Sequence, residues 1–178
     1  MILAAVCLMW WWGQAASEGC GGILTEPAGL IQTPEFPAPF SVPLKCQWLL
    51  DSSGLPEADV EIVIYLTQLF VTSGLTFTEY AFYDPLDSSL QRNPSLLLSV
   101  TEQNSVITRW LSTRSRFLLI ELELDRLEGN HIRALDNLLD VYGFNITYQM
   151  VTGPASNTSC SVMDCSFAGN CYISSDYR

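Results

Sequence analysis

Residues 117–125 read Phe-Leu-Leu-Ile-Glu-Leu-Glu-Leu-Asp, the most regular pattern in the chain. Apolar side chains at Leu118, Ile120, Leu122 and Leu124 alternate with acidic ones in the second half of the stretch. Successive side chains of a β-strand point to opposite faces, so one face of this segment is apolar and the other is charged. Such alternation is typical of an antiparallel strand with one face on a core and the other in water. The stretch therefore predicts a half-buried β-strand.

Segments with a similar pattern lie on both sides of this stretch. They are rich in β-branched and aromatic residues, and turn-forming residues separate them. A proline-rich segment at 26–43 excludes a helix there and suits an extended edge segment. The other predicted strands are one that begins at Cys46, then 60–70, 75–83, 96–100, 105–111 and 144–151. Short strands at this spacing indicate an all-β sandwich or barrel.

One segment has helical spacing instead. At 131–142 the apolar residues recur every three or four positions, with Asn130 as an N-cap and Gly143 as a C-cap. We expect a short amphipathic helix there, packed on the sandwich.

The amino-terminal segment is expected to be a signal peptide at 1–17. An apolar run at 2–12 is followed by small residues, and Ala15 and Ser17 suit a cut before Glu18. The alternative is a membrane anchor, but about a dozen apolar residues are too few to span a bilayer, which needs about 20. No other stretch is long and apolar enough, so we expect a secreted or extracellular chain.

Charge narrows the class of partner. The 178-residue chain has a formal net charge of -11, and an acidic surface repels phosphates, so neither nucleic acid nor anionic lipid is expected. Basic protein partners or Ca²⁺ suit it better. The alternative is that the acidity only keeps the protein soluble.

Cysteines and sequons agree with an oxidising secretory route. Five cysteines follow the signal segment: Cys20, Cys46, Cys160, Cys165 and Cys171. An odd count in a secreted protein implies an intermolecular partner, a free thiol or an incomplete sequence. Sequons at Asn145 and Asn157 are the candidate glycosylation sites.

Several separated motifs together resemble a CUB domain over residues 20–151. They are Cys20-Gly-Gly, Pro34-x-x-Pro37, Cys46-x-Trp48, Phe82-Tyr-Asp and Gly143-Phe-Asn-Ile-Thr-Tyr148. The resemblance implies an all-β, jelly-roll sandwich of antiparallel strands, in which the helix at 131–142 would be an inserted element. It also implies a disulfide between Cys20 and Cys46, which would add about 3 kcal/mol of stability.

The chain departs from the family pattern in two respects. No cysteine lies between Cys46 and Cys160, so the second disulfide of many CUB domains is absent. Some CUB domains also bind Ca²⁺ through a Glu and two Asp, and here only Glu79 and Asp125 are near the matching positions. We expect no cofactor, with Ca²⁺ at these two residues as the one candidate; the alternative is that the acids form a solvated strand face.

The carboxyl-terminal cysteines, spaced Cys160-x4-Cys165-x5-Cys171, are similar to the first half of an EGF-like module. Three cysteines without a nearby His do not make a closed zinc site. We therefore expect a linker at 152–159 and a truncated EGF-like module at 160–178. A CUB domain followed by such a module resembles attractin and the multiple-EGF-domain receptors, which implies a fragment or truncated isoform of a larger, membrane-anchored receptor ectodomain.

Catalytic motifs are missing from the sequence. His131 is the only histidine, and no nucleophile elbow, metalloprotease motif or phosphate-binding loop occurs. We do not expect an enzyme. The expected function is extracellular protein–protein interaction, through loops at one end of the sandwich. The alternatives are an accessory CUB domain of a secreted protease and a soluble decoy form of a receptor.

Overall fold

The structure is a computed structural model, and it describes residues 20–38, 40–56, 59–84, 89–90, 94–126 and 142–152. Within these ranges every regular element is a strand. The strands are β1 (Gly21–Leu24), β2 (Ala28–Gln32), β3 (Leu44–Asp51), β4 (Val60–Phe70), β5 (Leu75–Tyr80), β6 (Tyr83–Asp84), β7 (Ser89–Leu90), β8 (Ser95–Ser99), β9 (Trp110–Thr113), β10 (Phe117–Leu124) and β11 (Gly143–Thr152).

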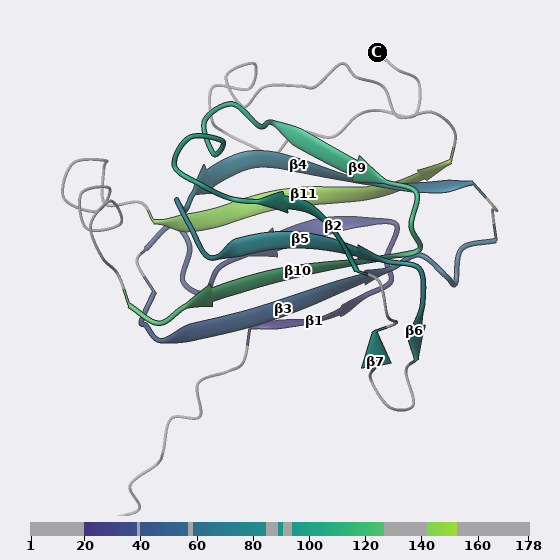
Figure 1. The fold of residues 1–178 in the computed structure, drawn as a ribbon, viewed down its shortest axis with the longest axis horizontal. Coiled ribbons are helices and arrows are strands. Elements are labelled where there is room, and N and C mark those ends of the chain that lie inside the picture. Colours follow the sequence, from purple (N-terminus) through teal and green to yellow (C-terminus); the bar gives the residue numbers. More distant parts are fainter. Residues whose placement is uncertain are drawn as a thin grey trace, which may run out of the picture.

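Two sheets form a sandwich. The five-stranded sheet has the order β1-β3-β10-β5-β8 and the four-stranded sheet the order β2-β11-β4-β9. Every pairing in them is antiparallel except that of β1 with β3. The small pair β6–β7 projects beyond one end of the sandwich, at the right in Figure 1. The expected fold class, an all-β jelly-roll-like sandwich, is confirmed, whereas the expected helix at 131–142 lies outside the described residues apart from Tyr142.

Most strands lie where the sequence predicts them. β4 coincides with the prediction, and β10 and β11 differ from theirs by one residue at an end. The predicted strand at 105–111 is wrong: residues 102–107 form turns, and β9 begins only at Trp110. The reason is Asn104, whose side chain accepts a hydrogen bond from the Thr101 amide at 2.7 Å and donates one to the Ser99 carbonyl at 2.8 Å. Such side-chain bonds to the backbone favour turns over strands.

The two ends of the sandwich sequence meet in its core. β11 lies between β2 and β4, with Ile146 opposite Ile31. Phe144 of β11 is fully buried, and its ring meets that of Trp48 edge-on at a centroid distance of 5.6 Å. Apolar residues with little or no exposure from both sheets complete this core, including Leu50, Ile62, Ile64, Leu75, Phe77, Leu118, Ile120 and Leu122. Burial of this apolar surface is the main force that holds the sheets together.

Gly143 allows β2 and β11 to approach each other. Its φ of 109° is one that other residues rarely adopt, and a Cβ there would lie 2.1 Å from the Thr33 hydroxyl oxygen. The close approach lets the Thr33 hydroxyl accept a hydrogen bond from the Phe144 amide at 3.2 Å, while the Thr33 amide donates to the Phe144 carbonyl at 3.0 Å. Gly143 is therefore the first residue of a strand, where the sequence predicted a helix C-cap.

A disulfide joins Cys20 to Cys46. The two Cα atoms lie 4.9 Å apart, within the ordinary range for a disulfide. Cys46 is fully buried, and β1 begins at the residue after Cys20. The bridge therefore fastens the first strand of the sandwich to β3, as the family resemblance implied.

Candidate functional site

The outer face of the five-stranded sheet has a polar half and an apolar half. Because Cys46, Trp48 and Leu50 point into the core, the alternate residues of β3 point outward. The same holds for the alternate residues of β10. The register places Lys45 beside Glu123, Gln47 beside Glu121, Leu49 beside Leu119 and Asp51 beside Phe117.

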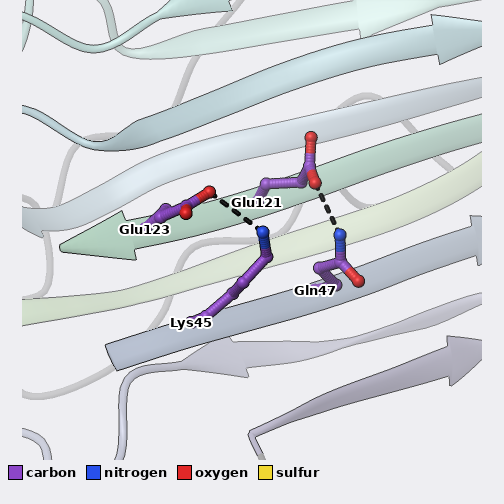
Figure 2. A network of polar contacts seen from close by, with 4 residues as sticks. All are labelled: Lys45, Gln47, Glu121 and Glu123. Carbon is purple, nitrogen blue, oxygen red and sulfur yellow. Dashed lines mark hydrogen bonds and ion pairs between the residues drawn. The ribbon is translucent and has the colours of Figure 1, made fainter. Parts of the chain in front are cut away.

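Two polar contacts make up the first half, as Figure 2 shows. The ammonium of Lys45 lies 3.1 Å from a carboxylate oxygen of Glu123, and the amide of Gln47 donates a hydrogen bond to Glu121 at 2.6 Å. The side chains of Lys45 and Glu123 are 59% and 60% exposed, so water screens their attraction. These contacts orient the acidic side chains but leave them accessible, and the predicted wet face of β10 is confirmed at Glu123.

The second half is a small apolar cluster, separate from the main core. Leu49, Phe117 and Leu119 are buried there, with Tyr80 and Tyr83 packed against them. The rings of Tyr83 and Phe117 lie 6.0 Å apart. Burial, and to a smaller extent the Glu121 carboxylate, raises the pKa of the Tyr80 phenol, so the phenol stays neutral. Tyrosines beside charged groups are common in protein interfaces.

A second surface lies at the end of the sandwich opposite β6 and β7. The segment between β8 and β9 is a loop in which the Asn104 carbonyl accepts hydrogen bonds from the amides of Ile107 and Thr108 at 3.2 and 2.9 Å. Together with the Asn104 side-chain bonds, these contacts fix the loop's shape. At its outer side, Val106 and Ile107 are 78% and 73% exposed, the highest values among the large apolar residues that the structure describes. The sequence gave no signal for this pair beyond the mistaken strand at 105–111.

Glu79 has a structural role between the two sheets. Its carboxylate, on β5, accepts a hydrogen bond from the hydroxyl of Thr113 on β9. That hydroxyl in turn accepts one from the Ser115 amide at 3.0 Å. Thr113 is buried and Glu79 is half-buried, so this contact ties the five-stranded sheet to the four-stranded one.

The two Ca²⁺ candidates do not lie together. Glu79 pairs with Leu118 across the ladder, whereas Asp125 follows β10 and lies seven residues further along that strand. At about 3.3 Å per residue the separation is about 20 Å, too far for both carboxylates to bind one ion. Over the described ranges, the structure has no group of three or more His, Cys, Asp or Glu residues placed to hold a metal.

The other predicted site residues fall in two classes. Asn145 lies in the middle of β11 with a half-buried side chain, and the sequon residue Thr147 is fully buried. Asn157, Cys160, Cys165, Cys171 and His131 all lie outside the described residues. Within the described part of the chain no helix is long and apolar enough to cross a membrane.

Comparisons with known proteins give short or distant likenesses. No family model matches the chain. A stretch of 38 residues is 42% identical to rat (Rattus norvegicus) cubilin, covering 21% of this chain and 1% of cubilin. The CUB1-EGF-CUB2 domains of rat MASP-1 are similar in structure, with 14% identity over 75% of this chain and 44% of theirs and a TM-score of 0.46.

Two further solved structures give likenesses of the same order. The CUB1-EGF-CUB2 domain of human MASP-1/3 has 16% identity, a TM-score of 0.48, and coverage of 75% of this chain and 43% of that one. The full extracellular region of zebrafish Gpr126/Adgrg6 has 11% identity and a TM-score of 0.48, with coverage of 76% of this chain and 15% of that one. The chain thus spans less than half the length of each of these relatives, and its function has to be argued from its own surfaces.

Proposed function

We propose that the chain is an extracellular protein-interaction module of the CUB type. The motifs at both ends of residues 20–151, the disulfide between Cys20 and Cys46, and the stretch similar to cubilin support this assignment. The observation that carries the binding function is the pair Val106 and Ile107, held in water at 78% and 73% exposure by a hydrogen-bonded loop.

An exposed apolar pair on a fixed loop is suited to insertion into a partner's pocket. Burial of one aliphatic side chain of this size gains about 1.5–3 kcal/mol, so the pair can contribute about 3–6 kcal/mol to binding. β-Branched side chains have few rotamers to lose, and the loop is already ordered, so little entropy opposes the contact. The gain is large enough to make the pair a binding hot spot.

The charge of the chain sets the chemistry of the partner. A net charge of -11 steers the molecule toward a basic surface, so the partner's apolar pocket is expected to have a cationic rim. Anionic membranes and nucleic acids are disfavoured for the same reason. Because Glu79 is engaged with Thr113 and lies far from Asp125, the binding needs no Ca²⁺ ion shared by these two residues.

The wider arrangement belongs to the same proposal. Residues 1–17 are a signal peptide that is removed, 20–151 form the CUB-type domain, 152–159 are a linker and 160–178 begin an EGF-like module. Asn145 and Asn157 carry glycans. The parent is a receptor ectodomain of which this chain is a fragment or truncated isoform, and the role is non-catalytic; an accessory domain of a secreted protease and a soluble decoy are the alternatives. Sequencing the transcript beyond Arg178 separates them, because further EGF-like cysteines and a membrane span support the receptor and a protease domain the accessory role.

The test is a binding screen with paired variants. The secreted chain is measured by biolayer interferometry against a panel of purified extracellular proteins that includes strongly basic ones. The double variant V106S/I107S is expected to lose at least about tenfold in affinity for any protein bound by the wild type. The matched control is F82S, which removes an exposed apolar side chain at the opposite end of the sandwich. Equal binding by V106S/I107S and wild type, or loss of affinity only in F82S, would overturn the proposal.

A further inference from the structure

β8 is an unprotected edge of the five-stranded sheet. It is hydrogen-bonded to β5 on one side only, so the backbone groups of its other side are free of sheet pairing. Its sequence, Ser-Leu-Leu-Leu-Ser, has no charge and no proline, and Leu96 is 60% exposed. Natural sheet edges are usually guarded by charged side chains, proline or irregular backbone, because an open edge accepts a further strand. Here one bulge, between Phe77 and Thr78 of β5, is the only such device along the strand.

The other edges of the two sheets offer less. β1 begins with two glycines and is only four residues long, and β9 has Arg109 immediately before it and Arg114 immediately after it. β2 contains Gly29, whose position is occupied closely by the Tyr148 ring of the neighbouring strand. Among the described edges, β8 is therefore the apolar, uncharged one.

The sequence of β8 is the same in both directions. In antiparallel pairing with itself about Leu97, Ser95 faces Ser99 and Leu96 faces Leu98, so each copy presents to the other what it receives. That self-complementarity is the requirement of a two-fold symmetric interface. We propose that β8 pairs antiparallel with β8 of a second copy of this chain, which joins two five-stranded sheets edge to edge.

Charge favours this edge over other ways for two copies to meet. Each copy has a net charge of -11, so approach is repelled wherever acidic side chains face each other. β8 has no charge, and the carboxylate of Glu79, across the ladder from Ser95, is engaged with Thr113 of the other sheet. Long-range repulsion between the copies remains, and salt screens it. The dimer is therefore expected to be weak at low salt and stronger as salt is added.

Sedimentation equilibrium tests the proposal. The secreted chain is studied in a C160S/C165S/C171S background, so that thiol-linked dimers do not contribute, from about 1 µM to about 1 mM protein. We expect a monomer–dimer equilibrium whose dimer fraction rises between about 0.05 M and about 0.5 M NaCl. L96K is expected to weaken association at least tenfold, because it places a charge on the edge. The control is I23K, an equal change at a similarly exposed residue, 54%, on the opposite edge of the same sheet.

Amide hydrogen exchange gives a second readout that needs no variant. In the dimer the outward amides of β8 gain partners, so exchange in residues 95–99 slows as protein concentration rises, while exchange in 21–24 does not change. A monomer throughout the concentration range would overturn the proposal. So would a dimer that L96K and I23K weaken equally, or one whose β8 amides are not protected.

Discussion

Replacement of Gly143 by alanine isolates the contact that closes the sandwich. The φ of 109° at this position disfavours any side chain, by about 1–2 kcal/mol. The new Cβ would also lie 2.1 Å from the Thr33 hydroxyl oxygen, so β2 and β11 must separate. The two hydrogen bonds between Thr33 and Phe144 are then lost or strained, at about 1 kcal/mol each. The free energy of unfolding should fall by about 3–4 kcal/mol, a large share of the 5–15 kcal/mol typical of a domain.

Gly22 supplies the matched control for this change. Its φ of 139° is also unfavourable for alanine, but no atom lies within 4 Å of the added Cβ. Both variants have the backbone penalty, and only G143A has the steric one. Guanidinium unfolding followed by the fluorescence of the buried Trp48 should therefore give a decrease about 2 kcal/mol larger for G143A than for G22A. Equal decreases would refute the reasoning that Gly143 is needed for the approach of β2 to β11.

Three further predictions concern single contacts. Burial raises the pKa of Tyr142, so the unfolded chain releases the phenol proton first and wild type should lose stability as the pH rises above about 10, more steeply than Y142F; equal slopes between about pH 8 and pH 11 would contradict this. T113V removes the hydroxyl that donates to Glu79 and should lower the free energy of unfolding by about 1–3 kcal/mol, against little change for T78V on the outer face; a T113V value no larger than that of T78V would show that the contact between the sheets is unimportant. K45A and E123A should each change stability by no more than about 0.5 kcal/mol in urea titrations, because the pair is well exposed, and a loss above about 2 kcal/mol would mean that the pair is shielded from water.

Much of the fold could be predicted from the sequence because the strands have one strongly apolar face. Leu118, Ile120 and Leu122 alternate with residues that face away from the core, and all three are fully buried. The prediction for β4, a strand with one or both faces covered, is confirmed with both faces covered, since Val63 and Tyr65 are as buried as Ile62 and Ile64. Period-two patterns of this kind indicate both the strand and its inner face.

Local side-chain chemistry and long-range register account for what the sequence did not predict. The apolar run Val106-Ile107 has high β-propensity, but the Asn104 bonds to Thr101 and Ser99 hold it in a turn. The outer cluster of Leu49, Phe117 and Leu119 depends on the pairing of β3 with β10, which alternation within one strand does not encode. Glu79 was assigned to an ion because the segment was compared with a family pattern, whereas its partner Thr113 lies on another sheet and 34 residues away in sequence.

Disulfide mapping of the secreted chain tests the central claim most directly, namely that this chain is an extracellular sandwich whose first strand is fastened to β3. Non-reducing proteolysis followed by mass spectrometry should recover a peptide that links Cys20 to Cys46, as the 4.9 Å separation of their Cα atoms requires. A peptide that links Cys46 to Cys160 instead, or Cys20 and Cys46 found as free thiols, would contradict the account.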